Sequence, residues 1–229
     1  MDIDQYIFVQ SVAKSVHAKL VKLIGPGSTE ASIVENAVQL LYEAGITETW
    51  YHNVPAFILL GSRSCLSISG RDYQPSEEKV GKKNLVTVDL SPSLKGVWGD
   101  CARSYFVEDG VCRAQPSGAD FIQGLRTELQ LHEEMMAYVK PETRFCDLFA
   151  FGNQKIKDCG FENLDFLGNL GHSIENDPSR RRYIDQDCKE KLGDVSMFTF
   201  EPHIRKKGFD WGYKHENIYY FQNGFLKEL

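Results

Sequence analysis

The stretch VTVDLSPSLKGVWGD, residues 86–100, contains two strand-like runs joined by a turn, and an aspartate interrupts each run. Aspartate is among the residues most depleted from strands, so Asp89 and Asp100 need a physical reason to be there. If the hairpin turns around Leu94 and Lys95, Asp89 lies opposite Asp100, with their Cβ atoms about 5 Å apart. Like charges in that position are destabilising, so something must offset the repulsion.

The chain around this hairpin repeats itself. Residues 25–46 and 140–161 each show a proline near the start, a helix-start signal, a helical apolar pattern and a terminating glycine. Another helical stretch precedes each segment, and a strand pair follows it. Two such units, about 1–113 and 114–229 within one domain (1–229), predict a pseudo-two-fold α+β fold with helices outside a curved antiparallel sheet. The alternative is a chance likeness between amphipathic helices.

The second strand pair carries acids at matching places. Glu201 shares a strand face with Thr199, and Glu216 follows across a turn near Gly208. A pseudo-two-fold axis brings this pair against the two aspartates, and four facing carboxylates cannot all ionise without a strong cation. His172, in GNLGHSIEND, is the remaining ligand candidate. One or two divalent metals suit this set, although each acid taken singly is equally typical of a solvated strand face.

The composition narrows the class of partner. The chain has 229 residues, a net charge of -6 and 42% hydrophobic residues, which is typical of a globular protein. The charge gives no reason to expect nucleic acid or an anionic membrane as a partner. No signal-peptide pattern or membrane span is present, so we expect a cytoplasmic protein. Six cysteines without a CxxC pair suggest neither a zinc knuckle nor a disulfide framework.

These residues, in this order, resemble the pita-bread metallopeptidases, the family of methionine aminopeptidase, aminopeptidase P and prolidase. The resemblance covers essentially the whole chain, including the spacing of eleven between Asp89 and Asp100. It implies that Asp89 binds one metal, that Asp100 and Glu216 bridge two, and that His172 and Glu201 complete the second site. The implied cofactors are two divalent ions (Mn, Co or Zn). Their bridging hydroxide would attack a peptide carbonyl, with Glu201 as general base.

Two accessory histidines of the proline-specific branch are missing, although Arg103 matches an arginine of that branch. Asp72 occupies the position seventeen residues before the first aspartate, and Ser179 the position seven residues after the GH histidine. We keep Asp72 as a candidate catalytic residue at the place of the first imidazole. His203, on the strand face of the preceding glutamate, is the candidate substitute. The run 180–182 of three arginines is either a solvated loop or a receiver for a substrate carboxylate.

Three functions follow from these residues. The first is a dinuclear Xaa-Pro aminopeptidase or dipeptidase with a peptide or dipeptide substrate. The second is a creatinase-like enzyme that needs no metal, and the presence of all five ligands argues against it. The third is a pita-bread binding protein with weak or no turnover, which the missing histidines favour. The aromatic residues of WYHNVPAF, 50–57, could serve a homodimer interface.

Overall fold

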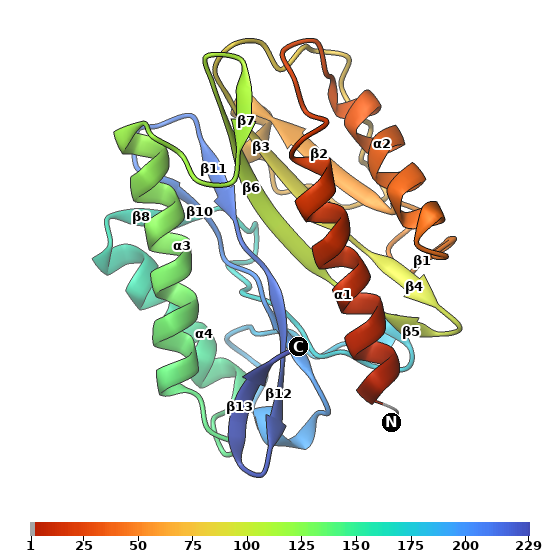
Figure 1. Cartoon of the computed structure of the whole chain (residues 1–229). Helices are drawn as coiled ribbons and strands as arrows, with labels where there is room; N and C mark the ends of the chain where they lie inside the picture. The colour runs from red at the N-terminus through yellow and green to blue at the C-terminus, as the bar shows by residue number, and fades with distance from the viewer. Residues whose placement is uncertain (1–2) are drawn as a thin grey trace.

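Two pairs of helices flank the strands of the protein (Figure 1). The computed structural model describes residues 3–229. The first pair is α1 (Ile3–Leu20) with α2 (Glu30–Glu43), and the second is α3 (Ala119–Tyr138) with α4 (Phe145–Asp158). The two pairs lie on opposite sides of the central strands. Within residues 3–229, none of the helices combines the length and the apolar character that a bilayer crossing requires.

The ends of α2 and α4 explain the glycines of the repeat. Gly45 and Gly160, one residue past the C-caps, have φ angles of 82° and 79°. Glycine enters this left-handed region without the steric cost of a Cβ atom, which is why it ends so many helices. At the start of α2, Thr29 Oγ1 accepts a hydrogen bond from the backbone N–H of Ser32 at 3.1 Å. The helix-start signal predicted for this segment is therefore a real cap.

Across residues 3–229 the strands form four small antiparallel sheets. The largest contains, in spatial order, β2 (Ala56–Leu60), β3 (Asn84–Leu90), β6 (Cys101–Glu108) and β7 (Val111–Arg113). A second sheet contains β1 (Glu48–Thr49), β4 (Pro92–Leu94) and β5 (Val97–Trp98). A third contains β11 (Gly212–Lys214), β10 (His203–Lys206) and β8 (Phe161–Asn163). The fourth contains β13 (Phe225–Glu228), β12 (Asn217–Gln222) and β9 (Phe198–Phe200). Three short 3₁₀ helices are η1 (Gly61–Cys65), η2 (Pro178–Arg180) and η3 (Leu192–Asp194).

The order of these elements confirms the predicted α+β class and the repeat. In each half two helices precede an antiparallel strand pair, β3 with β6 and β9–β10 with β11–β12. The halves meet where β6 borders β11. There the N–H of Lys214 donates to Ser104 Oγ at 2.8 Å, and the N–H of Glu216 donates to the carbonyl of Ala102 at 3.0 Å. These hydrogen bonds bring the start of β6, next to Asp100, beside the segment that carries Lys214 and Glu216.

Two large apolar clusters hold the helices against the strands. The first joins α1, α2, β2 and β3 around residues such as Leu20 and Val88. The second joins α3, α4, β9 and β10 around residues such as Phe145 and Phe198. Phe106 of β6 is fully buried in this second cluster, so a strand of the first half contributes to the core of the second. Burial of such side chains is the dominant favourable term in folding.

Candidate metal centre

The hairpin of residues 86–100 closes one position later than its sequence suggests. Leu94 pairs with Val97, and the two residues between them, Lys95 and Gly96, have φ angles of 52° and 80°. Positive φ at both central positions is typical of a two-residue hairpin turn, whose twist matches that of the strands. The expected turn around Leu94 and Lys95 is therefore wrong by one residue.

Asp89 and Asp100 still lie on the same side of the sheet. Asp89 faces Ala102 across β3 and β6, so its predicted pairing with Asp100 is wrong by two positions. Because side chains alternate with a period of two, a shift of two keeps both acids on one face. Asp100 lies in the short link before β6, and its N–H donates to Gln10 Oε1 at 3.0 Å. Helix α1 thus fixes the backbone of the second aspartate.

Glu201 and Glu216 lie at the strand ends of the second half, as Asp89 and Asp100 do in the first half. Phe200 pairs with Asn217 at the adjoining ends of β9 and β12, so the two glutamates are the next pair in the same register. The hydrogen bond from the N–H of Glu216 to the carbonyl of Ala102 then brings the carboxylate of Glu216 to the aspartates of the first half. Backbone pairing across the pseudo-two-fold axis therefore places these acids.

His172 enters the centre from a loop held against β9. Gly171 has φ 137°, and a Cβ there would collide with the carbonyl of Thr199. The N–H of His172 donates to Thr199 Oγ1 at 3.0 Å, and the N–H of Thr199 donates to the carbonyl of His172 at 2.7 Å. In this position His172 Nε2 lies 3.5 Å from Asp100 Oδ2 and 3.6 Å from Glu201 Oε1. The glycine of the GH motif is needed for this close approach.

The acids at the centre fit a divalent cation. Asp89, Asp100 and Glu216 each offer a carboxylate oxygen, and these three atoms lie within 4.8 Å of one another. Glu216 is 1% exposed, and neither of its carboxylate oxygens has a hydrogen-bond partner. A buried carboxylate without a partner is costly unless a cation or a proton compensates it. Oxygen ligands beside an imidazole are a donor set that several divalent metals accept.

The pKa values at the centre follow from the same crowding. Burial, with neighbouring carboxylates, raises the pKa of Asp100 and of Glu216 well above the usual range. Burial also lowers the pKa of His172 to about 4, which leaves its imidazole neutral at pH 7. A neutral imidazole has a free nitrogen lone pair for a metal.

Lys214 is a functional residue that the sequence interpretation missed. Its Nζ lies 2.6 Å from Asp89 Oδ2 and 3.1 Å from Glu201 Oε2. The neighbouring carboxylates raise the pKa of Lys214 well above its usual value although burial opposes this. A signal was present, because Lys214 precedes Glu216 by two residues and strand alternation puts both on one face.

Four of the five candidate ligands, Asp89, Asp100, His172 and Glu201, line a cavity of about 490 Å³. Its other lining residues include aromatic and apolar side chains, among them the exposed Phe166 and Leu167, together with polar ones such as Asp165 and Asn169. Arg181 reaches into the cavity: its Nη1 lies 3.4 Å from His172 Nε2. Of the three consecutive arginines, Arg180 is exposed outside the cavity, while Arg182 forms ion pairs with glutamates. A concave site that combines apolar side chains with convergent polar and charged groups is typical of a small-ligand site.

The sequence of the chain decides its family. Residues 6–223 match the model of metallopeptidase family M24. The chain belongs to metallopeptidase family M24. The family uses divalent metal ions, in agreement with the acidic cluster. Among curated proteins, none matches the sequence.

Solved structures confirm the predicted pita-bread fold of this M24 chain. An X-Pro aminopeptidase from Thermotoga maritima MSB8 superposes with a TM-score of 0.82 at 16% identity, over 99% of this chain and 60% of the other. A prolidase from Pyrococcus furiosus gives 0.80 at 18% identity, over 99% and 63%. Dipeptidase PepE from Mycobacterium ulcerans gives 0.79 at 19% identity, over 99% and 57%. The M24 chain thus spans about three fifths of these proteins.

The structure brings one of the two candidate accessory residues into the M24 site. His203 lines the cavity, and its Nε2 lies 2.6 Å from the carbonyl of Ser64. Asp72 does not line the cavity: it is exposed, in a turn where its N–H donates to the carbonyl of Ser69. The role of Asp72 in the place of a catalytic histidine stays a prediction, which its exposed position in this turn does not support. Ser69 lines the cavity instead.

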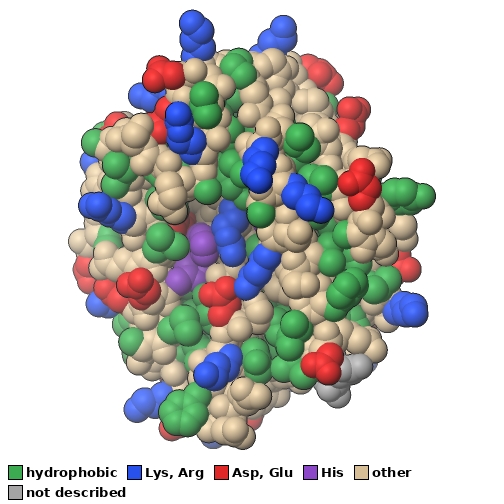
Figure 2. Space-filling model, in the orientation of Figure 1, with side chains coloured by type: hydrophobic (Ala, Val, Ile, Leu, Met, Phe, Trp, Pro, Cys, Tyr) green, Lys and Arg blue, Asp and Glu red, His purple; other side chains and the backbone are tan. Residues whose placement is uncertain are grey.

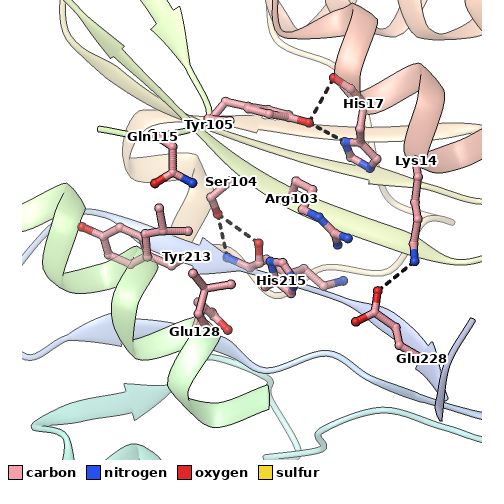
Figure 3. Close-up of a pocket in the computed structure, with 14 residues that line it drawn as sticks. Lys14, His17, Arg103, Ser104, Tyr105, Gln115, Glu128, Tyr213, His215 and Glu228 are labelled. Atoms are coloured by element: carbon pink, nitrogen blue, oxygen red, sulfur yellow. Dashed lines mark hydrogen bonds and ion pairs between the residues drawn. The ribbon is translucent and has the colours of Figure 1, made fainter. Parts of the chain in front are cut away.

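A second cavity, of about 360 Å³, lies on the other face of the strands (Figure 3). His215 and Arg103 line it, so strand alternation turns His215 away from the neighbouring ligand Glu216. Arg103 Nη1 donates to the carbonyl of Glu216, and Nη2 donates to Asn217 Oδ1 at 2.6 Å. Figure 2 shows histidine and basic side chains gathered in a hollow between the helix pairs. Arg103 therefore holds the backbone of the candidate ligand Glu216 from the face of the strands opposite the acidic cluster.

Proposed function

We propose that this M24 chain is an Xaa-Pro peptidase that uses two divalent ions, Mn²⁺, Co²⁺ or Zn²⁺, to hydrolyse a dipeptide or the N-terminal residue of a short peptide. One observation carries the proposal. Oxygens of Asp89, Asp100 and Glu216 lie within 4.8 Å of one another, and both aspartates line a cavity large enough for a dipeptide. The names of the similar solved structures support the choice of Xaa-Pro substrates.

The ligands divide between two positions in this proposal. Asp89, Asp100 and Glu216 would hold one ion. His172 and Glu201 would hold the second ion, together with the shared acids Asp100 and Glu216. Divalent ions bound there would supply an activated water at neutral pH and would polarise the scissile carbonyl. The neutral imidazole of His172 and the orphaned oxygens of Glu216 suit this role.

The protein's own groups would position the substrate and move its protons. Glu201 would be the general base. Lys214 and His172 hold its pKa below the usual value in spite of burial, so its carboxylate is ionised and can accept a proton. Thr199 Oγ1 donates a hydrogen bond to its Oε1 at 3.1 Å. His203 Nε2 donates to the carbonyl of Ser64, and burial lowers the pKa of this histidine to about 4, so its free Nδ1 would accept a proton at the cavity wall. Arg181 would receive a carboxylate of the substrate in a bidentate contact.

A second function, peptide binding without turnover, is favoured by one specific observation. Asp72 does not line the cavity, so the accessory imidazoles there are His203 and, at the rim, His52. Loss of a general acid or base typically costs about 10²- to 10⁴-fold in rate. A chain with metal and substrate affinity but negligible rate would fit this alternative.

Metal analysis followed by a substrate panel tests the proposal. Protein stripped with a chelator and reloaded with Mn²⁺, Co²⁺ or Zn²⁺ should retain two ions after gel filtration, and Asp100→Ala should lose them. Asp72→Ala, an exposed aspartate, is the matched control and should retain them. Release of the N-terminal residue from Xaa-Pro and Xaa-Pro-Yaa peptides should follow the metal content. Bound metal with no cleavage of any peptide would favour the binding function, and failure to bind metal would refute both.

A further inference from the structure

The second cavity, of about 360 Å³, is lined by residues from both halves of the protein (Figure 3). Helices α1 and α3 contribute Lys14 and Glu128, and strands β6 and β11 contribute Arg103 and Tyr213. The cavity lies on the face of these strands opposite the acidic cluster, so the proposed peptidase site does not use it. Its volume is in the range of sites that bind small molecules.

One charged side chain of this cavity has no partner. Lys14 and Glu228 pair with each other, with Lys14 Nζ 2.8 Å from Glu228 Oε1. The guanidinium of Arg103 donates to two backbone carbonyls. Glu128 is only 1% exposed, and across the described residues 3–229 neither of its carboxylate oxygens has a hydrogen-bond partner. A buried carboxylate without a donor is unfavourable, so this group requires a partner from outside the chain.

Two other buried glutamates show what such a carboxylate requires. Glu30 is also fully buried, and its Oε1 accepts hydrogen bonds from the N–H of Leu60 at 2.9 Å and from Arg63 Nε at 2.8 Å. Its Oε2 accepts a further backbone N–H at 2.8 Å, so both oxygens are satisfied within the fold. Glu216 lacks such partners and belongs to the acidic cluster that fits a cation. Glu128 therefore resembles the carboxylate of a ligand site rather than a structural one.

The surroundings of Glu128 select the class of ligand. In the part of the chain that the structure describes, Glu128 belongs to no group of three residues that could hold a metal ion. Leu125 and Leu129 line the cavity from the same helix, and Tyr213 lines it from β11. Burial raises the pKa of Glu128 well above its usual value, and a cation that donates N–H groups would stabilise the ionised form. An organic cation with an apolar body suits both the carboxylate and the leucines.

We propose that the second cavity binds a small primary alkylammonium ion, which donates hydrogen bonds to Glu128 and packs its alkyl chain against Leu125 and Leu129. The ammonium supplies the donors that the fold does not supply, and contact with the leucines removes the alkyl chain from water. Because this cavity and the acidic cluster lie on opposite faces of the strands, the binding requires neither metal nor peptide hydrolysis.

Calorimetric titration of metal-free protein with n-butylammonium chloride, at constant ionic strength, tests the inference without reference to activity. Wild-type protein should show saturable binding. Glu128→Gln keeps the size of the side chain and removes its charge, and should weaken this binding by about tenfold or more. Glu133→Gln, at an exposed glutamate of the same helix, is the matched control and should behave as wild type. 1-Butanol, which has the same chain without the charge, should bind at least about tenfold more weakly.

Glu216→Gln tests whether the ammonium binds at the acidic cluster instead. This variant should keep the binding; loss of binding here, with retention in Glu128→Gln, would overturn the inference. Absence of saturable binding in wild type would also overturn it and would leave the proposed metal centre intact. Crystals of wild type soaked with n-butylammonium chloride give a test that does not depend on a variant folding. The nitrogen should lie within hydrogen-bond distance of Glu128, and ordered water alone on that carboxylate would contradict the inference.

Discussion

The guanidinium carbon of Arg181 lies 4.8 Å from the centre of the Trp50 ring, and it also lies 5.5 Å from the centre of the Tyr183 ring. The aromatic faces hold the guanidinium beside the candidate ligand His172. Its Nε donates to the carbonyl of Pro178 at 2.7 Å and its Nη1 lies 3.4 Å from His172 Nε2, so the outer edge of the guanidinium faces the cavity. Among the three consecutive arginines, this one is therefore preorganised to meet an anionic group in the cavity.

Arg181→Ala should weaken binding of substrates that carry a free carboxylate. We expect KM for an Xaa-Pro dipeptide to rise about 10- to 100-fold, because a bidentate charge-assisted contact is lost. KM for the corresponding dipeptide amide should change little. Steady-state kinetics with both substrates gives the comparison, and Arg180→Ala is the control at an exposed neighbour. Equal losses for acid and amide would show that Arg181 does not bind the carboxylate.

His203→Gln should lower kcat and leave the metal content unchanged. His203 lines the cavity and is held by its contact with the carbonyl of Ser64, a contact that glutamine can also make. Loss of an acid or base typically lowers the rate by about 10²-fold or more. Single-turnover rates and metal analysis measure the two effects separately, and His52→Gln at the cavity rim is the control. An unchanged kcat would leave His203 without a catalytic role.

Glu216→Gln should abolish metal binding without destabilising the metal-free protein. The carboxylate is buried without a partner, so its neutral isostere should keep or raise the free energy of unfolding, by about 1 to 3 kcal/mol. Urea unfolding in the presence of a chelator measures the stability, and the rise of Tm on adding Mn²⁺ reports binding. Glu77→Gln, at an exposed glutamate, should keep the metal-induced rise. Strong destabilisation by Glu216→Gln would mean that this carboxylate has an unrecognised partner.

Gly171→Ala should destabilise the protein and displace His172. The residue has φ 137°, and its Cβ would meet the backbone of Thr199, so we expect a loss of about 2 kcal/mol or more. Gly45→Ala is the matched control: it shares the positive φ but has open space around its Cβ, and should cost about 1 kcal/mol. Denaturant unfolding of the two variants gives the comparison. Equal losses would show that backbone strain, rather than the collision, explains the glycine.

The buried His132 should make stability depend on pH. Burial lowers its pKa to about 3, from 6.5 in an exposed histidine. The unfolded chain therefore binds more protons below pH 6.5, and stability should fall as the pH falls from about 6.5 toward 3. Between pH 7 and pH 5 this histidine should cost wild type about 2 kcal/mol relative to His132→Gln. Unfolding free energies of both proteins across this range test the difference, and parallel profiles would contradict it.

Much of the fold follows from local patterns. The helix-helix-strand-strand repeat is visible because a helix cap, an apolar period and a terminating glycine are properties of short segments, and Gly45 and Gly160 end their helices as predicted. The hairpin register was predicted less well. A two-residue turn can be placed at several adjacent positions, and only the positive φ angles at Lys95 and Gly96 fix it. Asp89 pairs with Ala102, two residues from its predicted partner Asp100, so both aspartates still lie on one face of the sheet as predicted.

The sequence by itself determined the M24 family and the five candidate ligands, because their residue types, order and spacing are linear properties of the chain. Tertiary structure decided which other groups reach the cavity. Asp72 has the family spacing but lies on an exposed turn, while Lys214 and Arg181 reach the ligands from strand β11 and from a loop. These positions depend on backbone pairing between β6 and the second half and on stacking against Trp50. Lys214 has one local signal, its place two residues before Glu216, whereas the contact of Arg181 with Trp50 joins distant segments and leaves no pattern in the neighbouring sequence.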